Sequence, residues 1–356
     1  MKTKFYGKKI SGILTLLPET EYCFEEDMKF NNLSEKQNRK LQKTMGYDKH
    51  RIFKGDTYLS KVAIFGINHM IENNMIEKED ISAIVLSTTS PDYLMPATSN
   101  IIMEGVGLDS SVFCMDTNQQ CAGFTNGLLQ AFMLLNNDEM KKIILITGDV
   151  MARNPDRSNT SSYPLSGDAV CLTIVENCSK NLPIYLHTDI NAKDYDALVF
   201  PGMGWRESTQ EEKEKFASSK YGGYDYLPCL HMDGQAVFQY VMQDVPKYIN
   251  ETLDFAQLDK DDLDYYLFHQ PNKFMVDKLA QKIGVAHKKV PSNVVTFYGN
   301  SNSSTIPVSI CHNIKQEVLN TRHNCMLAGF GAGLSYSGII MEIGEFDFCE
   351  MVITSY

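Results

Sequence analysis

The chain repeats one pattern of segments after an interval of about 180 residues. The run "DISAIVLSTTS" from Asp80 returns as "DDLDYYLFHQPN" from Asp261, and "KKIILITGDV" returns as "HNCMLAGFGAG". Between them, "SVFCMDTNQQCAGFTNGLLQAFMLL" is matched by "NVVTFYGNSNSSTIPVSICHNI", and we interpret each of these as a strand, a polar turn and an apolar helix. Three segments at a nearly constant offset predict two similar halves, residues 1–178 and 179–356.

Helical patterns separate the predicted strands. Apolar residues recur with a period near 3.6 in residues 61–74, and again along one face of residues 272–283. Strands that alternate with helices indicate mainly parallel sheets covered by helices. The expected fold class is therefore α/β.

The composition argues against several classes of protein. The 356 residues include 33 Lys+Arg and 44 Asp+Glu, for a net charge of −11, whereas nucleic-acid binding needs clustered basic side chains. The apolar runs are far shorter than the roughly 20 residues that cross a bilayer. The apolar piece at residues 13–17 is also too short for a signal-peptide core. We therefore expect a cytoplasmic protein that binds neither nucleic acid nor membrane.

Nine cysteines without a C-x-x-C pair fit neither a disulfide framework nor a structural zinc site. We expect reduced thiols and no metal. Cys121 differs from the others because it follows a predicted strand and begins an apolar helix. The free N–H groups and positive dipole end of a helix start favour a thiolate, which predicts a lowered pKa and a nucleophile. The alternative is an inert buried cysteine.

Two polar residues of the second half follow predicted strands. His269 ends "YYLFHQPN", and Asn300 lies in "FYGNSNSS", the repeat counterpart of the Cys121 segment. Taken singly, His269 also suits a core histidine or a cap, and Gly-Asn is an ordinary turn sequence. If the halves pack about a pseudo-twofold axis, the three strand ends face one site. A cysteine with a histidine and an amide there predicts a covalent acyl-transfer centre.

The order of these motifs resembles the β-ketoacyl-[acyl carrier protein] synthase III family of the thiolase superfamily. The matching motifs are "QQCAGFTNGL", "FHQPN", "YGNSNSSTIP" and "GFGAGLSYSG", together with "TTSPDYLMPATS", "SGDAV" and "MDGQAVFQYV". They cover most of the chain between residues 60 and 342. The resemblance implies a five-layer αβαβα fold built from two similar halves, a homodimer, and an active site between the halves.

The resemblance also implies roles for individual residues. Cys121 matches the nucleophile that takes an acyl group from a thioester donor, and His269 and Asn300 match the pair that hydrogen-bonds the carbonyl of a malonyl thioester during decarboxylation. The backbone N–H groups of Cys121 and Ala332 match the oxyanion hole. Gly331 and Gly333 match substrate contacts. Met95 matches a residue that reaches into the partner subunit's acyl pocket. No bound cofactor is implied; acyl-CoA or acyl carrier protein thioesters are the substrates.

Two departures from the family pattern concern the acyl donor. The segment at residues 38–52 lacks the tryptophan that grips CoA in the family, since the only tryptophan is Trp205, and residues 345–356 extend beyond the usual end. Both favour an acyl carrier protein donor and a specialised fatty-acid or polyketide-type pathway. The carrier is acidic in the family, and its expected docking site is a basic helix face with Lys273, Lys278 and Lys282; the alternative is a solvated helix face.

Three functions remain open at this stage. The main hypothesis is a decarboxylating condensing enzyme that uses Cys121, His269 and Asn300. The second is an acyltransferase that moves the acyl group from Cys121 to a hydroxyl or amine without decarboxylation. The third is a non-catalytic partner subunit, which the presence of all three side chains argues against.

Overall fold

The computed structural model of the chain describes residues 1–151, 165–201, 206, 209–212 and 230–356. Every predicted site residue lies within these ranges, whereas Trp205 lies outside them. None of the helices in the described ranges combines the length and the apolar character that a bilayer crossing requires. Within the same ranges, no group of three His, Cys, Asp or Glu side chains is arranged to hold a metal ion.

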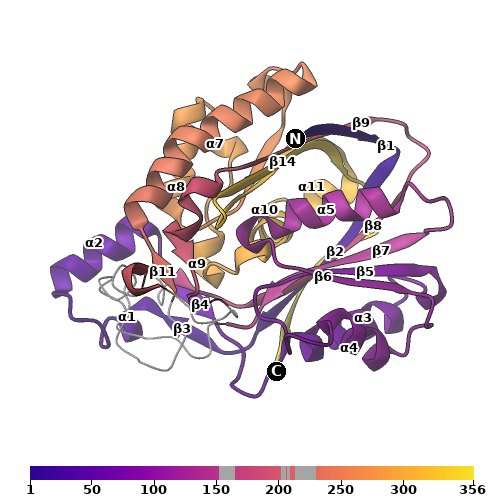
Figure 1. Cartoon of the computed structure of the whole chain (residues 1–356), viewed down its shortest axis with the longest axis horizontal. Helices are drawn as coiled ribbons and strands as arrows, with labels where there is room; N and C mark the ends of the chain where they lie inside the picture. The colour runs from indigo at the N-terminus through magenta and orange to yellow at the C-terminus, as the bar shows by residue number, and fades with distance from the viewer. Residues whose placement is uncertain (152–164, 202–205, 207–208, 213–229) are drawn as a thin grey trace.

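Two sheets form the framework (Figure 1). The first has six strands in the order β15-β2-β8-β7-β5-β6: Phe348–Thr354, Lys8–Pro18, Ala169–Asn177, Lys142–Asp149, Ile81–Ser87 and Phe113–Thr117. The second has five in the order β1-β9-β14-β13-β12: Lys2–Tyr6, Pro183–Ile190, Ser335–Gly344, Arg322–Gly331 and Tyr265–Phe268. Two further antiparallel pairs of short strands join β3 (Glu21–Cys23) to β4 (Lys49–Arg51) and β10 (Leu198–Val199) to β11 (His231–Met232).

Helices cover the sheets on both sides and fill the space between them. They are α1 (Phe24–Asp27), α2 (Glu35–Met45), α3 (Leu59–Glu72), α4 (Thr98–Val106), α5 (Gly123–Leu134), α7 (Gly234–Ala256), α8 (Lys273–Ile283), α9 (Val294–Tyr298), α10 (Thr305–Asn313) and α11 (Lys315–Asn320). The outer pairs are α3 with α4 on the first sheet and α7 with α8 on the second, while α5 and α10 lie between the sheets. The result is five layers.

Three apolar clusters hold these layers together. One lies between the two sheets around α5 and α10, one joins the second sheet to α7 and α8, and one joins the first sheet to α3 and α4. Side chains on both faces of each sheet are therefore removed from water, which explains why β5 and β7 read as nearly continuous apolar runs. Burial of this apolar area is the main force that stabilises the layered arrangement.

Most elements expected from the repeat are present. The runs from Asp80 and Asp261 become β5 and β12, those from Lys141 and His323 become β7 and β13, and residues 61–74 and 272–283 become α3 and α8. One expectation is wrong, because residues 294–298 form the helix α9 instead of a strand. The backbone N–H of Val294 donates to the buried side-chain Oε1 of Gln270 at 2.9 Å, so it bonds to a side chain and not to a strand. Tertiary contacts here override the strand preference of valine and phenylalanine.

The two ends of the chain are exchanged between the sheets. The first strand, β1, pairs with β9 in the sheet of the second half, and the last strand, β15, pairs in parallel with β2 in the sheet of the first half. The boundary between residues 178 and 179 falls between β8 and β9 and stays a prediction. The segment 345–356 supplies the edge strand of the six-stranded sheet, so it is an integral part of the fold.

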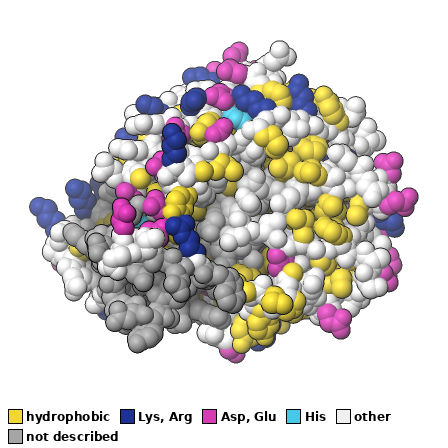
Figure 2. Space-filling model, viewed as in Figure 1, with side chains coloured by type: hydrophobic (Ala, Val, Ile, Leu, Met, Phe, Trp, Pro, Cys, Tyr) yellow, Lys and Arg dark blue, Asp and Glu magenta, His cyan; other side chains and the backbone are white. Residues whose placement is uncertain are grey.

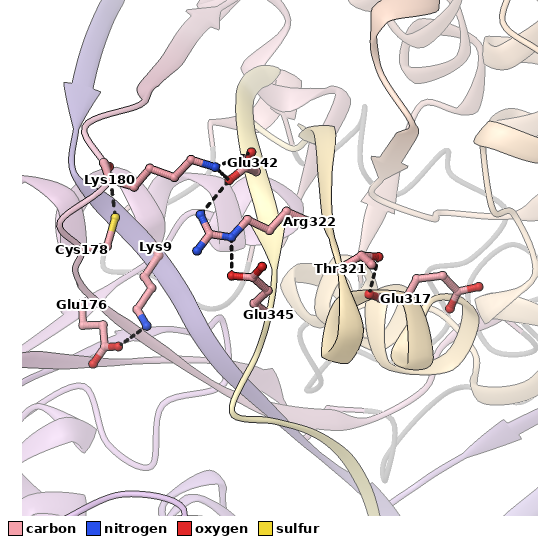
Figure 3. A network of polar contacts seen from close by, with 9 residues as sticks. All are labelled: Lys9, Glu176, Cys178, Lys180, Glu317, Thr321, Arg322, Glu342 and Glu345. Atoms are coloured by element: carbon pink, nitrogen blue, oxygen red, sulfur yellow. Dashed lines mark hydrogen bonds and ion pairs between the residues drawn. The ribbon is translucent and has the colours of Figure 1, made fainter.

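A polar network fixes the start of this segment (Figure 3). Arg322 at the start of β13 donates from Nε to Glu345 at 2.6 Å and from a terminal nitrogen to Glu342 at 3.0 Å. Lys180 donates to the same Glu342 carboxylate at 2.8 Å. A guanidinium held by two carboxylates has a defined direction, so the turn between β14 and β15 is positioned by side chains from both neighbouring segments.

Candidate active site

Cys121 lies at the junction of the two halves. It belongs to a single 3-10 turn, Gln120–Ala122, that connects the carboxyl end of β6 to α5. The start of α5 fits tightly against both halves, because a side-chain methyl at Gly123 would lie 2.2 Å from Oγ of Ser87 and 2.9 Å from Cβ of Ser303. Glycine is needed at this position for close approach, and it places the Cys121 turn against the second half.

The electrostatic environment of Cys121 differs from the expectation. Only 8% of the residue is exposed, and burial raises the pKa of its thiol to about 12, with a further upward effect from the Asp149 carboxylate. The backbone N–H of Ala332 acts in the opposite direction. The predicted lowering of the pKa by the helix start is therefore wrong for the free enzyme: the energetic cost of a buried thiolate exceeds the benefit from the nearby N–H groups. Cys121 rests as a thiol.

The glycine-rich loop, residues 329–333, begins in the last residues of β13 and lies directly against this thiol. A methyl at Gly331 would lie 2.7 Å from Cβ and 2.9 Å from Sγ of Cys121, and a methyl at Gly329 would lie 2.6 Å from the Cα of Ala122. Gly333 has a φ of +130°, which L side chains rarely adopt. The lack of a side chain at Gly331 allows the Ala332 N–H to approach the sulfur.

His269 follows β12 and is 1% exposed. Its Nδ1 lies 2.8 Å from Oγ1 of Thr305, and that hydroxyl donates its one proton to the backbone carbonyl of Asn302 at 3.0 Å. Oγ1 must therefore accept from Nδ1–H, which leaves the lone pair on Nε2. Burial lowers the pKa of the imidazole to about 3, against a smaller opposing effect of the Asn302 carbonyl. The ring is neutral, and it packs edge-on against Phe330 with centroids 5.8 Å apart.

Asn300 is placed by two glycines that meet back to back. Gly299 has a φ of +78°, and a methyl on it would lie 2.8 Å from the backbone nitrogen of Gly167. A methyl on Gly167 would in turn lie 2.0 Å from the carbonyl oxygen of Tyr298. The Asn300 side-chain Oδ1 accepts from the backbone N–H of Asn302 at 2.9 Å. This bond fixes the orientation of the amide and leaves its NH2 group as the end that can donate to a ligand.

Two residues that the sequence did not single out tie this site together. Asp149 ends β7 in the first half, and its buried carboxyl accepts from the side-chain amide of Asn302 in the second half at 2.8 Å. Burial raises the pKa of Asp149, while hydrogen bonds from Thr89, Asn302 and Thr88 act against that effect. The only sequence signal was indirect, since Asp149 ends a predicted strand and Asn302 lies two residues after Asn300.

Met95 does not join the cluster formed by Cys121 and the glycine-rich loop. It is 84% exposed, and the neighbouring Tyr93 and Leu94 are exposed as well. Consecutive large apolar side chains at the surface of a single chain mark a segment that is suited to contact with another surface.

The three predicted docking lysines lie on α8 but are not equivalent. Lys273 is half-buried against Gly46 and forms an ion pair with Asp277, whereas Lys278 and Lys282 are exposed. The neighbouring helix α2 contacts α8 and adds basic side chains that the sequence analysis did not select: Lys36, Arg39, Lys40 and Lys43, all exposed. Figure 2 shows basic side chains at the left edge of the molecule, where α2 lies in Figure 1.

Comparisons with known proteins show which family the chain belongs to. The family model described as 3-oxoacyl-[acyl-carrier-protein (ACP)] synthase III matches residues 115–193, and the model of its C-terminal part matches residues 253–343. A β-ketoacyl-[acyl-carrier-protein] synthase III from Lactococcus lactis subsp. cremoris is 31% identical over 277 residues, 77% of this chain and 81% of the relative. A Campylobacter jejuni protein named as a candidate 3-oxoacyl-[acyl-carrier-protein] synthase 3 is 28% identical over 97% of this chain and 96% of its own.

The solved structures extend the likeness to the whole fold. The 3-oxoacyl-(acyl-carrier protein) synthase of Burkholderia xenovorans LB400 has a TM-score of 0.91 at 25% identity and covers 99% of both chains. The fold and these matches define a condensing enzyme of the thiolase superfamily, which confirms the expected five-layer α/β class. The chain belongs to the 3-oxoacyl-[acyl-carrier-protein] synthase III family.

Proposed function

We propose that this enzyme transfers an acyl group from an acyl thioester to Cys121 and then condenses it with a malonyl-[acyl carrier protein], with loss of CO2. The observation that carries the proposal is the fixed orientation of Asn300, whose Oδ1 is occupied by the Asn302 N–H. The remaining NH2 group is a donor. A donor aimed into a water-poor site stabilises the negative charge that decarboxylation places on the enolate oxygen.

The first half-reaction forms a thioester on Cys121. Sγ attacks the donor carbonyl, the bond to the donor sulfur breaks, and the thiol proton ends on the departing thiol. The Ala332 N–H approaches Sγ, and this supports the assignment of the N–H groups of Ala332 and Cys121 as donors to the oxyanion. Because the resting thiol is neutral, its proton must leave as Sγ attacks, and it passes to the departing donor sulfur.

The second half-reaction forms the new carbon–carbon bond. The malonyl C–C bond breaks to release CO2, and its electrons form an enolate whose oxygen accepts from the Asn300 amide and from Nε2 of His269, which takes up the one proton that the condensation consumes as the enolate forms. The enolate carbon attacks the acyl-Cys121 carbonyl and expels the cysteine sulfur. One proton returns to that sulfur, so each condensation consumes one proton and releases one CO2. Gly331 and Gly333 leave room for the substrate beside the sulfur.

An acyltransferase without decarboxylation is the second candidate, because one observation favours it. The neutral imidazole of His269 carries its lone pair on Nε2, and a neutral imidazole can deprotonate a hydroxyl or amine acceptor. The low pKa makes His269 a weak base, however, and transfer to a hydroxyl requires no oriented amide at Asn300. Condensation therefore uses more of the site than simple transfer does.

The acyl donor is proposed to be an acyl carrier protein in a specialised fatty-acid or polyketide-type pathway, in the cytoplasm. The support is the absence of tryptophan from residues 38–52 and the basic surface formed by α8 and α2. An acidic carrier would be steered to Lys278 and Lys282, with α2 extending the positive surface. No cofactor is required, because each step uses only side chains, backbone N–H groups and the thioesters.

A homodimer is proposed on two grounds: the unpaired outer edge of β6 and the exposed apolar segment that contains Met95. The strand β6 stands at the edge of the six-stranded sheet, and no other strand of the described ranges pairs with its outer side. An unpaired edge with the partly exposed Phe113 is suited to strand pairing with a second copy. The exposed segment with Met95 would then be covered, and Met95 would limit acyl length in the partner subunit's pocket.

The test separates the half-reactions. The protein is incubated with acyl-CoA or acyl carrier protein donors and weighed intact, then given malonyl carrier protein labelled in the free carboxyl group. We expect a mass increase by one acyl group that disappears in Cys121→Ala, followed by release of labelled CO2. Acylation with an intact malonyl thioester would instead establish the acyltransferase alternative. No acylation from any donor would point to a non-catalytic subunit.

A further inference from the structure

A buried carboxyl of the first half is bonded to the loop that carries the candidate catalytic amide of the second. Oδ1 of Asp149 accepts from the backbone N–H of Thr89 at 2.7 Å and from the hydroxyls of Thr89 and Thr88 at 2.8 and 3.0 Å. Oδ2 accepts from the side-chain amide of Asn302 at 2.8 Å. The two oxygens therefore have separate tasks: Oδ1 is held by the first half, and Oδ2 holds the second.

Asn302 connects the Asp149 carboxyl to both candidate catalytic side chains. Its backbone N–H donates to Oδ1 of Asn300, and its carbonyl accepts from the Thr305 hydroxyl that fixes Nδ1 of His269. Its φ is +50°, in the left-handed region, where asparagine is tolerated but most L residues are strained. A backbone in that conformation is kept only when its surroundings hold it, and the bond to Asp149 is such a restraint.

We propose that Asp149 and Asn302 form a positioning pair, through which the first half of the molecule sets the amide direction of Asn300 and the tautomer of His269 in the second half. This inference rests on the proposed condensation. Neither residue is assigned contact with substrate; both act through Asn300 and His269. The pair makes the decarboxylation geometry depend on correct packing of one half on the other.

The separate tasks of the two Asp149 oxygens allow a reciprocal exchange of the two side chains. In Asp149→Asn, Oδ1 still accepts from Thr88 and Thr89, but an NH2 group now faces the NH2 group of Asn302. In Asn302→Asp, two carboxylates face each other. In the double variant Asp149→Asn/Asn302→Asp, the donor and acceptor are merely reversed, so the bond re-forms. The surrounding hydrogen bonds and the side-chain sizes stay the same in all three.

The experiment measures each half-reaction in the full-length enzyme under single-turnover conditions. We expect each single variant to slow CO2 release from malonyl carrier protein by about tenfold or more, because small displacements of reacting groups have large effects on rate. Acylation of Cys121 should change by less than about threefold, and the double variant should recover most of the CO2 release. Asn137→Asp, the same substitution at an exposed position away from the pair, serves as the control: its Oδ1 still accepts from the Glu139 N–H, and the variant should keep the rates of the parent.

Three results would overturn the pair. They are single variants with normal CO2 release, equal losses in both half-reactions, and a double variant no better than the singles. If Asp149→Asn fails to fold, Asn302→Gly replaces it, since glycine adopts the left-handed backbone but lacks the bond to Asp149. The same selective loss of CO2 release is expected for it, and normal CO2 release would contradict the pair.

A substrate-independent readout keeps this inference distinct from the proposed function. Nitrogen-15 NMR of labelled histidine, with the His269 signal assigned from His269→Gln, reports which ring nitrogen carries the proton. We expect Nδ1–H in the parent and the double variant, and a mixture of tautomers in the single variants. If the parent enzyme performs neither half-reaction, the proposed function fails while the tautomer still decides the pair. An unchanged tautomer in both single variants would contradict control of His269.

Discussion

Gly331 lies so close to Cys121 that a single methyl group on its Cα would stand 2.7 Å from the cysteine Cβ and 2.9 Å from its Sγ. Real Cβ atoms do not approach other heavy atoms this closely, so the loop would have to move away. Any such movement also displaces the N–H of the next residue, Ala332, which approaches the sulfur.

Gly331→Ala is therefore expected to lower the rate of Cys121 acylation by about a hundredfold, because both the thiol and its nearest donor are displaced. The rate is followed by intact mass against time at saturating donor. Gly234→Ala is the matched control, since nothing lies within 4 Å of a methyl at that position. Equal acylation rates in the two variants would show that the glycine-rich loop is not part of the site.

Alkylation of Cys121 in the free enzyme should be slow at neutral pH. Burial raises the pKa of the thiol to about 12, so the thiolate fraction grows about tenfold for each pH unit up to that value. At pH 8 we expect iodoacetamide to modify Cys121 about a thousandfold more slowly than in the unfolded chain, where the pKa is near 9.0. Peptide mapping separates Cys121 from the other cysteines. Half-maximal alkylation below pH 8 would show that the start of α5 outweighs burial.

The neutral state of His269 should make the fold less stable in mild acid. Its pKa falls to about 3 on folding, so the unfolded chain binds the proton first as the pH drops below about 6.5. Stability falls wherever the unfolded state binds more protons, and for this one group the free energy of unfolding should be about 2 kcal/mol lower at pH 5 than at pH 8.

The measurement is urea denaturation at both pH values, in the parent and in His269→Gln. Because other histidines also titrate, the informative quantity is the difference between the two proteins. The variant should lose less stability at pH 5 than the parent does. An identical loss in both would mean that His269 is protonated in the folded enzyme.

Charge reversal at Lys278 and Lys282 should weaken use of the carrier protein. Two exposed like charges contribute to long-range attraction of an acidic partner, and we expect the KM for acyl carrier protein to rise about tenfold at low salt and less at high salt. The KM for a small acyl thioester should stay constant. Lys141→Glu is the control, because Lys141 precedes β7 at the end of the sheet opposite Asp149. An unchanged KM for the carrier protein would show that the lysines of α8 form a solvated helix face and not a docking site.

The repeated segments predicted much of the fold because they are governed by local patterns. The apolar runs of β5, β7, β12 and β13 and the period of α3 and α8 depend on a few neighbouring residues each. Where distant contacts compete, the prediction fails: Val294 and Val295 belong to a short helix because the N–H of Val294 bonds to the side chain of Gln270. The exchange of β1 and β15 between the sheets could not be read from the sequence. Strand order depends on which sheet edges are still unpaired when the end strands pack, and this is a property of the whole fold.

The sequence by itself determined which chemical groups are present: a thiol at Cys121 after one strand, an imidazole at His269 after another, and an amide at Asn300 in a polar turn. Only the tertiary structure decided their states. Burial makes the thiol and the imidazole neutral, and it reverses the pKa expected for Cys121 from its place before a helix. The bond from Asn302 to Asp149 joins residues 153 positions apart. Charge, tautomer and amide direction depend on atoms that surround a group in space, so no local pattern encodes them.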